Sequence, residues 1–199
     1  ELASVSLTAK LWFAKFQYIG IVTPPVAWLA YAAFYVGRPA LITRRRMLLA
    51  ALVPWITVLL VFTNEWHHLI WASAELETYR SWTMLSVTYG LWFWVHTIYS
   101  YIFLAVGTLF LFQGLVLSSA LYQNQIIIMV LGALGPWIAN ALYISGLSPF
   151  PYLDLTPFGF TISSIIFGWG MLRFRLFDVL PSPLVTLWFR RTCRSIGGS

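Results

Sequence analysis

The chain has 199 residues, of which 60% are hydrophobic and only 9% are charged. Soluble domains carry about 25% charged residues, so this chain has too few polar side chains to coat a water-exposed surface. The same hydrophobicity excludes disorder. The net charge of +6 does not indicate nucleic-acid binding, because the basic residues form no interleaved patch. The single cysteine, Cys193, excludes an internal disulfide and a cysteine-based zinc site. A polytopic membrane protein remains.

Stretches without Asp, Glu, Lys or Arg indicate where the chain crosses the membrane. They cover residues 16–37, 47–64, 81–153 and 155–172. A crossing helix needs about 20 apolar residues, so the longest stretch must fold back, and its polar patch at 118–124 predicts the turn. Segments that are apolar on every side favour helices over barrel strands. We predict an all-α, polytopic transmembrane helix bundle with five spans, near 16–36, 47–63, 91–117, 125–145 and 155–172.

The distribution of charge predicts the orientation of the bundle. Nine of the 12 basic residues lie between the first two spans or after the last one, and five of the six acidic residues lie elsewhere. Cytoplasmic loops are enriched in Lys and Arg, so the long loop at 64–90 is expected outside and the C-terminus in the cytoplasm. A chain that starts outside, without an initiator Met, predicts further spans upstream.

The outer loop and the spans beside it carry the candidate binding residues. Aromatic walls with a few polar groups suit a small-molecule pocket, for which the 64–90 loop would form a lid. A kink at Pro136 would open a cavity for Asn140 to line. An aromatic belt, with histidines bonded to loop backbone, explains the same residues equally well. The predicted ligand-binding residues are Trp66, His67, His68, Trp71, His96, Tyr99 and Asn140.

Recognisable catalytic motifs are missing from the sequence. Nucleotide-binding loops, HExxH and the glycine fingerprints of dinucleotide folds do not occur, and no two histidines have the four-residue spacing that a helical metal site favours. We therefore predict a chain without a catalytic site, metal or cofactor. Two alternatives to a sensor stay open. One is a small transporter or permease, which would need an internal repeat, and the other is a membrane enzyme that uses the outer histidines.

Several motifs resemble the N-terminal seven-transmembrane sensor region of bacterial and archaeal histidine kinases. The matching pieces occur in the family's order and spacing, from about residue 9 to residue 181. They are 11–20 followed by Pro24 and Pro25, then Asn64 with His67, His68, Leu69 and Trp71, then 135–137 with Asn140 and Tyr143, then 153–157, and finally 173–178 with Pro181.

The resemblance implies that the five spans are the third to seventh of the family and that residues 1–181 form a sensor domain. The parent would be a homodimeric two-component kinase in the cytoplasmic membrane of a bacterium or archaeon. It would bind a small-molecule signal outside and move helices towards a cytoplasmic output module, through differential affinity for two helix arrangements. Residues 182–199 do not match the family pattern. We predict that they form a basic, disordered tail in the cytoplasm. The predicted coupling residues are Asp154, Pro157, Arg173, Arg175 and Asp178.

Overall fold

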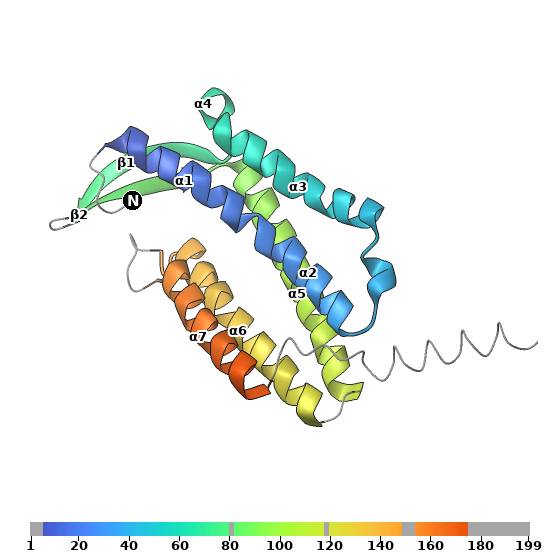
Figure 1. Ribbon diagram of the computed structural model, residues 1–199. Coiled ribbons are helices and arrows are strands. Elements are labelled where there is room, and N and C mark those ends of the chain that lie inside the picture. The colour runs from blue at the N-terminus through green and yellow to red at the C-terminus, as the bar shows by residue number, and fades with distance from the viewer. Residues whose placement is uncertain (1–5, 80–81, 118–119, 149–153, 175–199) are drawn as a thin grey trace, which may run out of the picture. The chain divides into compact units, whose positions relative to one another are not determined.

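The computed structural model describes residues 6–79, 82–117, 120–148 and 154–174. These residues divide between two compact units, residues 1–32 with 40–109 and residues 33–39 with 110–199. The elements, labelled in Figure 1, are α1 (Leu7–Ile21), α2 (Thr23–Tyr35), the 3-10 turn η1 (Pro39–Leu41), α3 (Arg44–Phe62), α4 (Asn64–His67), β1 (Trp71–Tyr79), β2 (Trp82–Tyr89), α5 (Leu91–Leu117), α6 (Ala120–Ile144) and α7 (Thr156–Phe174).

The described residues contain four helical segments that are long and apolar enough to cross a membrane. They are Leu7–Tyr35, Arg44–Phe62, Leu91–Val116 and Gln123–Ile144. The predicted all-α polytopic class is thereby confirmed, and these segments correspond to the first four predicted spans. The fifth predicted span forms α7, a helix of 19 residues that is not among these four segments. A fifth crossing therefore stays a prediction.

A one-residue break separates α1 from α2 inside the first apolar segment. Val22 ends α1, and its N–H donates to the carbonyl of Tyr18. Pro24 and Pro25 then occupy the first turn of α2, where a backbone N–H has no helical partner and proline is tolerated. The two prolines thus follow directly on a change from one helix to the next.

The loop between α3 and α5 contains a β-hairpin that was not predicted from the sequence. β1 pairs antiparallel with β2, with Leu76 opposite Leu85. Strand side chains alternate between two faces, so Ser73 and Glu75 lie on the face away from the leucines. On the leucine side, Val87 packs against the core. The alternation of polar and apolar residues was present in the sequence, but the aromatic residues at both strand ends read as an interfacial belt.

The core of the first unit joins the hairpin to α1 and α3. The ring of Trp71, the first residue of β1, meets the ring of Tyr18 on α1 edge to face, with centroids 5.6 Å apart. α1 also packs beside α3 (Figure 1). The start of the hairpin therefore cannot shift without disturbing both helices. The buried members of this core are Tyr18, Val22, Val61, Ile70 and Trp71.

In the second unit, α6 and α7 pack side by side (Figure 1). A Cβ placed on Gly159 would lie 2.9 Å from the Cα of Pro136. A Cβ on Gly132 would lie 2.8 Å from the ring of Phe167. Small residues at such crossings allow helix backbones to touch in a membrane. Glycine is required at position 159, where the neighbour is backbone, whereas at position 132 a larger residue would have to displace the Phe167 ring.

Candidate functional site

The predicted ligand-binding residues divide between the two units. Asn140, on α6, belongs to the second unit, and the other members belong to the first. Within the first unit the two tryptophans have opposite environments. Trp66 on α4 is 86% exposed, whereas Trp71 is 5% exposed and belongs to the core. Of the two, only Trp66 is positioned to meet a ligand from solvent.

His67 holds the turn between α4 and the hairpin. Its Nδ1 accepts a hydrogen bond from the N–H of Leu69, at 3.0 Å. Its Nε2 lies 3.1 Å from the hydroxyl of Thr63, and that hydroxyl donates to the carbonyl of Leu59. A hydroxyl has one proton, so Nε2 carries a hydrogen and donates to Thr63. The bond to the Leu69 N–H is the one expected if the histidines serve the loop backbone beneath an aromatic belt. A ligand-binding role for His67 stays a prediction.

His68 ends α4 in the left-handed conformation, with φ of 55°. Its backbone N–H donates to the carbonyl of Asn64 at 2.8 Å, and its side chain is exposed. A non-glycine residue with positive φ costs about 1 kcal/mol or more. The bonds of the surrounding turn hold the residue in place and direct its imidazole outward.

Asn64 is the main anchor of the hairpin, and it was not among the predicted site residues. Its Oδ1 accepts from the N–H groups of Ile70 and Trp71, at 2.9 and 3.1 Å. Its Nδ2 donates to the carbonyl of Trp71 at 3.0 Å. One buried side chain at the start of α4 therefore replaces a neighbouring strand for Ile70 and for Trp71, the first residue of β1. The signal in the sequence was a lone amide directly after an apolar span.

The start of α5 is tied to the same turn. The N–H of Gly90 donates to the carbonyl of Ile70 at 2.8 Å, and the N–H of Trp92 donates to the carbonyl of Leu69 at 2.9 Å. A Cβ on Gly90 would lie 2.6 Å from the carbonyl oxygen of His68. Since backbone cannot yield as a flexible side chain does, only glycine fits here. The turn thus connects the ends of α3 and α5.

The side chain of a buried lysine on α1 contacts a glutamate on α4. Lys15 lies within the first apolar helix, although the sequence analysis placed it just before that span, and it is 4% exposed. Its Nζ lies 2.5 Å from Oε1 of Glu65 and donates to the carbonyl of Phe62 at 3.3 Å. It also lies 5.1 Å from the ring centroid of Trp12. The hydrogen bond from Lys15, aided by one from the Glu65 backbone, holds the pKa of that carboxyl below its usual value.

A polar network joins the second half of α3 to the first half of α5. Thr57 donates its hydroxyl proton to the carbonyl of Val53 at 2.8 Å and accepts from Nε1 of Trp92 at 2.9 Å. His96 is 5% exposed, with Nδ1 3.4 Å from the Thr57 hydroxyl and Nε2 3.3 Å from the Ser100 hydroxyl. Because the proton of Thr57 is used on Val53, Nδ1 carries the histidine hydrogen and Nε2 accepts from Ser100. His96 thus has a partner on both sides.

Tyr99 replaces a hydrogen bond that a proline removes. Pro54 lies inside α3 and has no N–H, so the carbonyl four residues earlier, that of Ala50, loses its helical partner. The hydroxyl of Tyr99 on α5 donates to this carbonyl. The predicted binding role of Tyr99 stays a prediction, and in the structure its hydroxyl links α5 to the backbone of α3.

The second unit contains the same device. Pro136 lies inside α6 and leaves the carbonyl of Gly132 without its helical partner. The buried hydroxyl of Ser163 on α7 donates to that carbonyl. The freed carbonyl fixes α7 against α6. Asn140 lies one turn further along α6, and its predicted place in a ligand cavity stays a prediction.

The predicted coupling residues occupy the two ends of α7. Asp154 accepts at Oδ1 from the N–H of Thr156 at 2.8 Å, which supports the start of the helix. Pro157 lies in the first turn, where its missing N–H is not needed. Arg173 lies in the last turn and is exposed. The remaining two, Arg175 and Asp178, lie outside the described residues.

Metal coordination has no geometric support among the described residues. In 6–79, 82–117, 120–148 and 154–174, no three His, Cys, Asp or Glu side chains gather closely enough to hold an ion. His67 and His96 instead have the local hydrogen bonds described above. The arrangement suits mechanical linkage between the hairpin and the helices, with Trp66 and His68 exposed at the surface.

Comparison with known proteins identifies one similar family. A family model described as the N-terminal 7TM region of histidine kinase matches residues 1–181. Neither the curated proteins nor the solved structures gave a match. The matched range covers every described residue of both units, and with them the whole predicted ligand site.

Proposed function

Because this chain belongs to the family of N-terminal 7TM regions of histidine kinases, we propose that it receives a signal at its outer hairpin and relays it as helix movement. The family makes it a membrane-embedded sensor region, and the parent protein carries a kinase output module. Our proposal adds the place where the signal acts and the route by which it leaves.

The anchor at Asn64 carries the proposal. Asn64, which begins α4 two residues after α3 ends, bonds Ile70 and Trp71, the first residue of β1. The carbonyls of Leu69 and Ile70 bond the start of α5. A ligand that shifts the hairpin must therefore either break these bonds or move both helix ends. Packed and hydrogen-bonded contacts tend to switch between discrete arrangements, so the second outcome transmits a signal.

The exposed side chains next to this anchor give the binding chemistry. Trp66 and His68 project from α4 and from the turn that follows it. An indole face and an imidazole together suit a small ligand with an aromatic or cationic group and a hydrogen-bonding group. His67, Trp71, His96 and Tyr99 would then respond to the ligand through the hairpin and α5 instead of touching it.

The length and charge of α3 support the proposed orientation in the membrane. This helix has 19 residues, or about 28 Å at 1.5 Å per residue, which matches the apolar thickness of a bilayer. Arg44, Arg45 and Arg46 at its start would then face the cytoplasm under the positive-inside rule. Asn64 and the hairpin would lie on the opposite side, where an external signal arrives.

Cysteine labelling tests the orientation. In a Cys193→Ser background, we expect a membrane-impermeant maleimide added to intact cells to label Ser73→Cys, on the hairpin, and to leave Thr43→Cys, before α3, unlabelled. Lysed cells provide the control, since both positions should then react. Labelling of position 43 alone in intact cells would place the hairpin in the cytoplasm and refute the proposed signal site.

Kinase output tests the relay. We expect Asn64→Ala in the parent protein to change autophosphorylation in membrane vesicles, because it frees the hairpin from α3. Glu75→Gln is the matched control, since Glu75 is exposed on the hairpin and lies outside the anchor. Equal output from the wild type, Asn64→Ala and Glu75→Gln, at equal protein levels, would refute the relay.

A further inference from the structure

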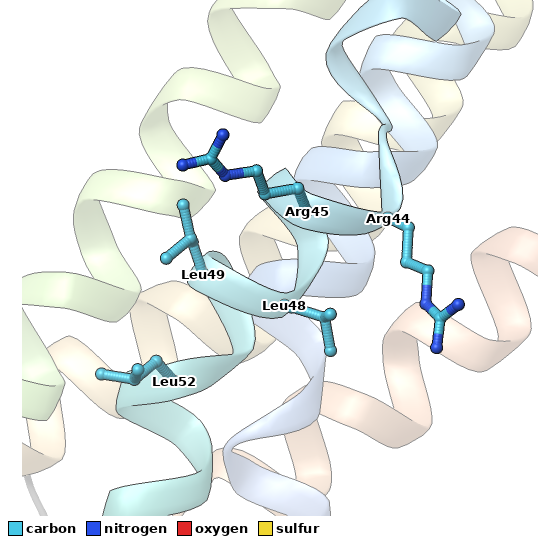
Figure 2. Close-up of a pocket in the computed structure, with 5 residues that line it drawn as sticks. All are labelled: Arg44, Arg45, Leu48, Leu49 and Leu52. Atoms are coloured by element: carbon cyan, nitrogen blue, oxygen red, sulfur yellow. The ribbon is translucent and has the colours of Figure 1, made fainter.

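The N-terminal end of α3 has a surface hollow that the sensor role does not use. It measures about 450 Å³ and is lined by Arg44, Arg45, Leu48, Leu49 and Leu52. Figure 2 shows the arginine side chains extending to either side of the helix, with the leucines following along it. The hollow therefore has a cationic end and an apolar floor.

The apolar floor faces outward from a helix that can cross a membrane. Leu48, Leu49 and Leu52 are 61%, 63% and 51% exposed, and α3 is one of the candidate spans. In a membrane such a surface contacts acyl chains, while arginines at the helix end reach the headgroup layer. The depth of each side chain thus matches a different part of one phospholipid.

The arginines at the cationic end have no carboxylate partner among the described residues. The structure places the side chain of Glu65 on Lys15, and no described acid pairs with Arg44 or Arg45. Guanidinium groups bind phosphate through paired N–H donors. An anionic group at this depth, on either side of the helix, would meet an unneutralised guanidinium beside an apolar surface.

We propose that the hollow binds an anionic phospholipid, with its phosphate on Arg44 or Arg45 and its acyl chains along Leu48, Leu49 and Leu52. The site lies in whichever leaflet borders the start of α3. It requires only that α3 lies in a membrane, so it does not depend on the hairpin receiving a signal.

The neighbouring Arg46 offers a matched control. Its Nη1 donates to the carbonyl of Ala40 at 2.8 Å, which directs it to the preceding turn and away from the hollow. The substitution Arg46→Gln removes one positive charge next to Arg45, as Arg44→Gln and Arg45→Gln do at their own positions. A site at Arg44 and Arg45 therefore predicts unequal effects, whereas diffuse attraction between the protein and anionic lipid predicts equal ones.

Native mass spectrometry of the detergent-solubilised chain, with added phosphatidylglycerol or phosphatidylcholine, measures the site directly. We expect tighter binding of phosphatidylglycerol. The preference should fall about fivefold for at least one of the substitutions Arg44→Gln and Arg45→Gln, the usual contribution of a basic residue at an anionic surface, and less than about twofold for Arg46→Gln. Circular dichroism of each variant shows whether the helices are retained.

Other results would overturn the proposal. Equal losses for all three arginines would mean diffuse attraction, and equal binding of the two lipids would mean no headgroup recognition. Displacement by soluble glycerol phosphate at the same concentration would mean a site for phosphate alone. If the chain forms a dimer and the double substitution Arg44→Gln and Arg45→Gln dissociates it, a second copy covers the hollow and the proposal is wrong.

Discussion

The hydroxyl of Tyr99 should stabilise the protein only because Pro54 is present. Pro54 leaves the carbonyl of Ala50 without a helical donor, and Tyr99 supplies one from α5. Tyr99→Phe removes that donor and keeps the ring, which packs on Phe103 with centroids 4.2 Å apart. The change therefore isolates one hydrogen bond between α3 and α5.

Tyr99→Phe should lower the free energy of unfolding of the wild type by about 1 kcal/mol. A buried carbonyl left unsatisfied costs about 1–3 kcal/mol, but hydrogen bonds between membrane helices average only about 0.6 kcal/mol, with a maximum near 1.7. In a Pro54→Ala background the N–H of residue 54 can bond Ala50 again. Tyr99→Phe should then cost less than about 0.3 kcal/mol, which gives a coupling energy between the two changes of about 0.7 kcal/mol or more.

Unfolding of the four proteins of this cycle by dodecyl sulfate in mixed micelles, followed by circular dichroism, gives the free energies. Equal losses for Tyr99→Phe in the two backgrounds would show that the hydroxyl does not replace the missing N–H. An undiminished loss in the Pro54→Ala background would refute the reasoning even if Tyr99→Phe destabilised the wild type.

Three further predictions use the same unfolding assay. Ser163→Ala should cost about 1 kcal/mol in the wild type and much less with Pro136→Ala, because the restored N–H then bonds Gly132. Gly159→Ala should cost about 1–3 kcal/mol, because its Cβ would meet the Pro136 backbone, whereas Gly168→Ala has open space around it and should cost nothing. The free energy of unfolding should fall as pH drops from the usual Glu65 pKa of 4.5 through its lower folded value. That fall should stay under about 1 kcal/mol, since the carboxylate is mostly exposed, and Glu65→Gln should abolish it.

Each of these predictions has its own contrary outcome. Ser164→Ala is the control for Ser163, because Ser164 donates within its own helix to the carbonyl of Phe160. Equal losses from the two serine changes would contradict the interhelical role of Ser163. Equal effects of the two alanine substitutions at glycine would show that α6 and α7 do not touch at Gly159. Unchanged pH dependence after Glu65→Gln would assign that dependence to another group.

Charge and hydropathy were enough to predict the long helices. Long gaps between charged residues marked the segments that became α1–α2, α3, α5, α6 and α7, because the part of a helix inside the apolar layer of a bilayer rarely carries charge. The starting residue of the first helix was less predictable. Lys10 and Lys15 looked like a boundary, yet both are buried within α1, and a lysine that finds a partner can lie inside an apolar helix.

The hairpin and the hydroxyl donors were beyond the reach of those patterns. Ser73, Glu75 and Leu76 showed strand alternation, but a short alternation flanked by tryptophans is also typical of an interfacial loop. The bond from Tyr99 to Ala50 depends on how α3 and α5 align in space, which no spacing along the chain encodes. The Pro136 signal was readable, because the carbonyl that a proline frees always lies four residues earlier.

Candidate binding residues were recognised by type, whereas their roles required geometry. His67 and Trp71 looked like pocket residues because histidine and tryptophan are common in pockets. In the structure His67 bonds Leu69 and Thr63, and Trp71 packs on Tyr18. Asn64 drew attention only through the family motif, since a single amide does not reveal which backbone groups it will bond.

Hydrogen exchange of the chain in nanodiscs, measured by mass spectrometry for the wild type and Asn64→Ala, tests most directly whether the hairpin and the helix ends move together. We predict faster exchange, by about fivefold or more, at Ile70 and Trp71, which lose their acceptor, and also at Gly90 and Trp92 at the start of α5. Faster exchange confined to residues 70 and 71, with positions 90 and 92 as protected as in the wild type, would contradict the proposed link between the hairpin and α5.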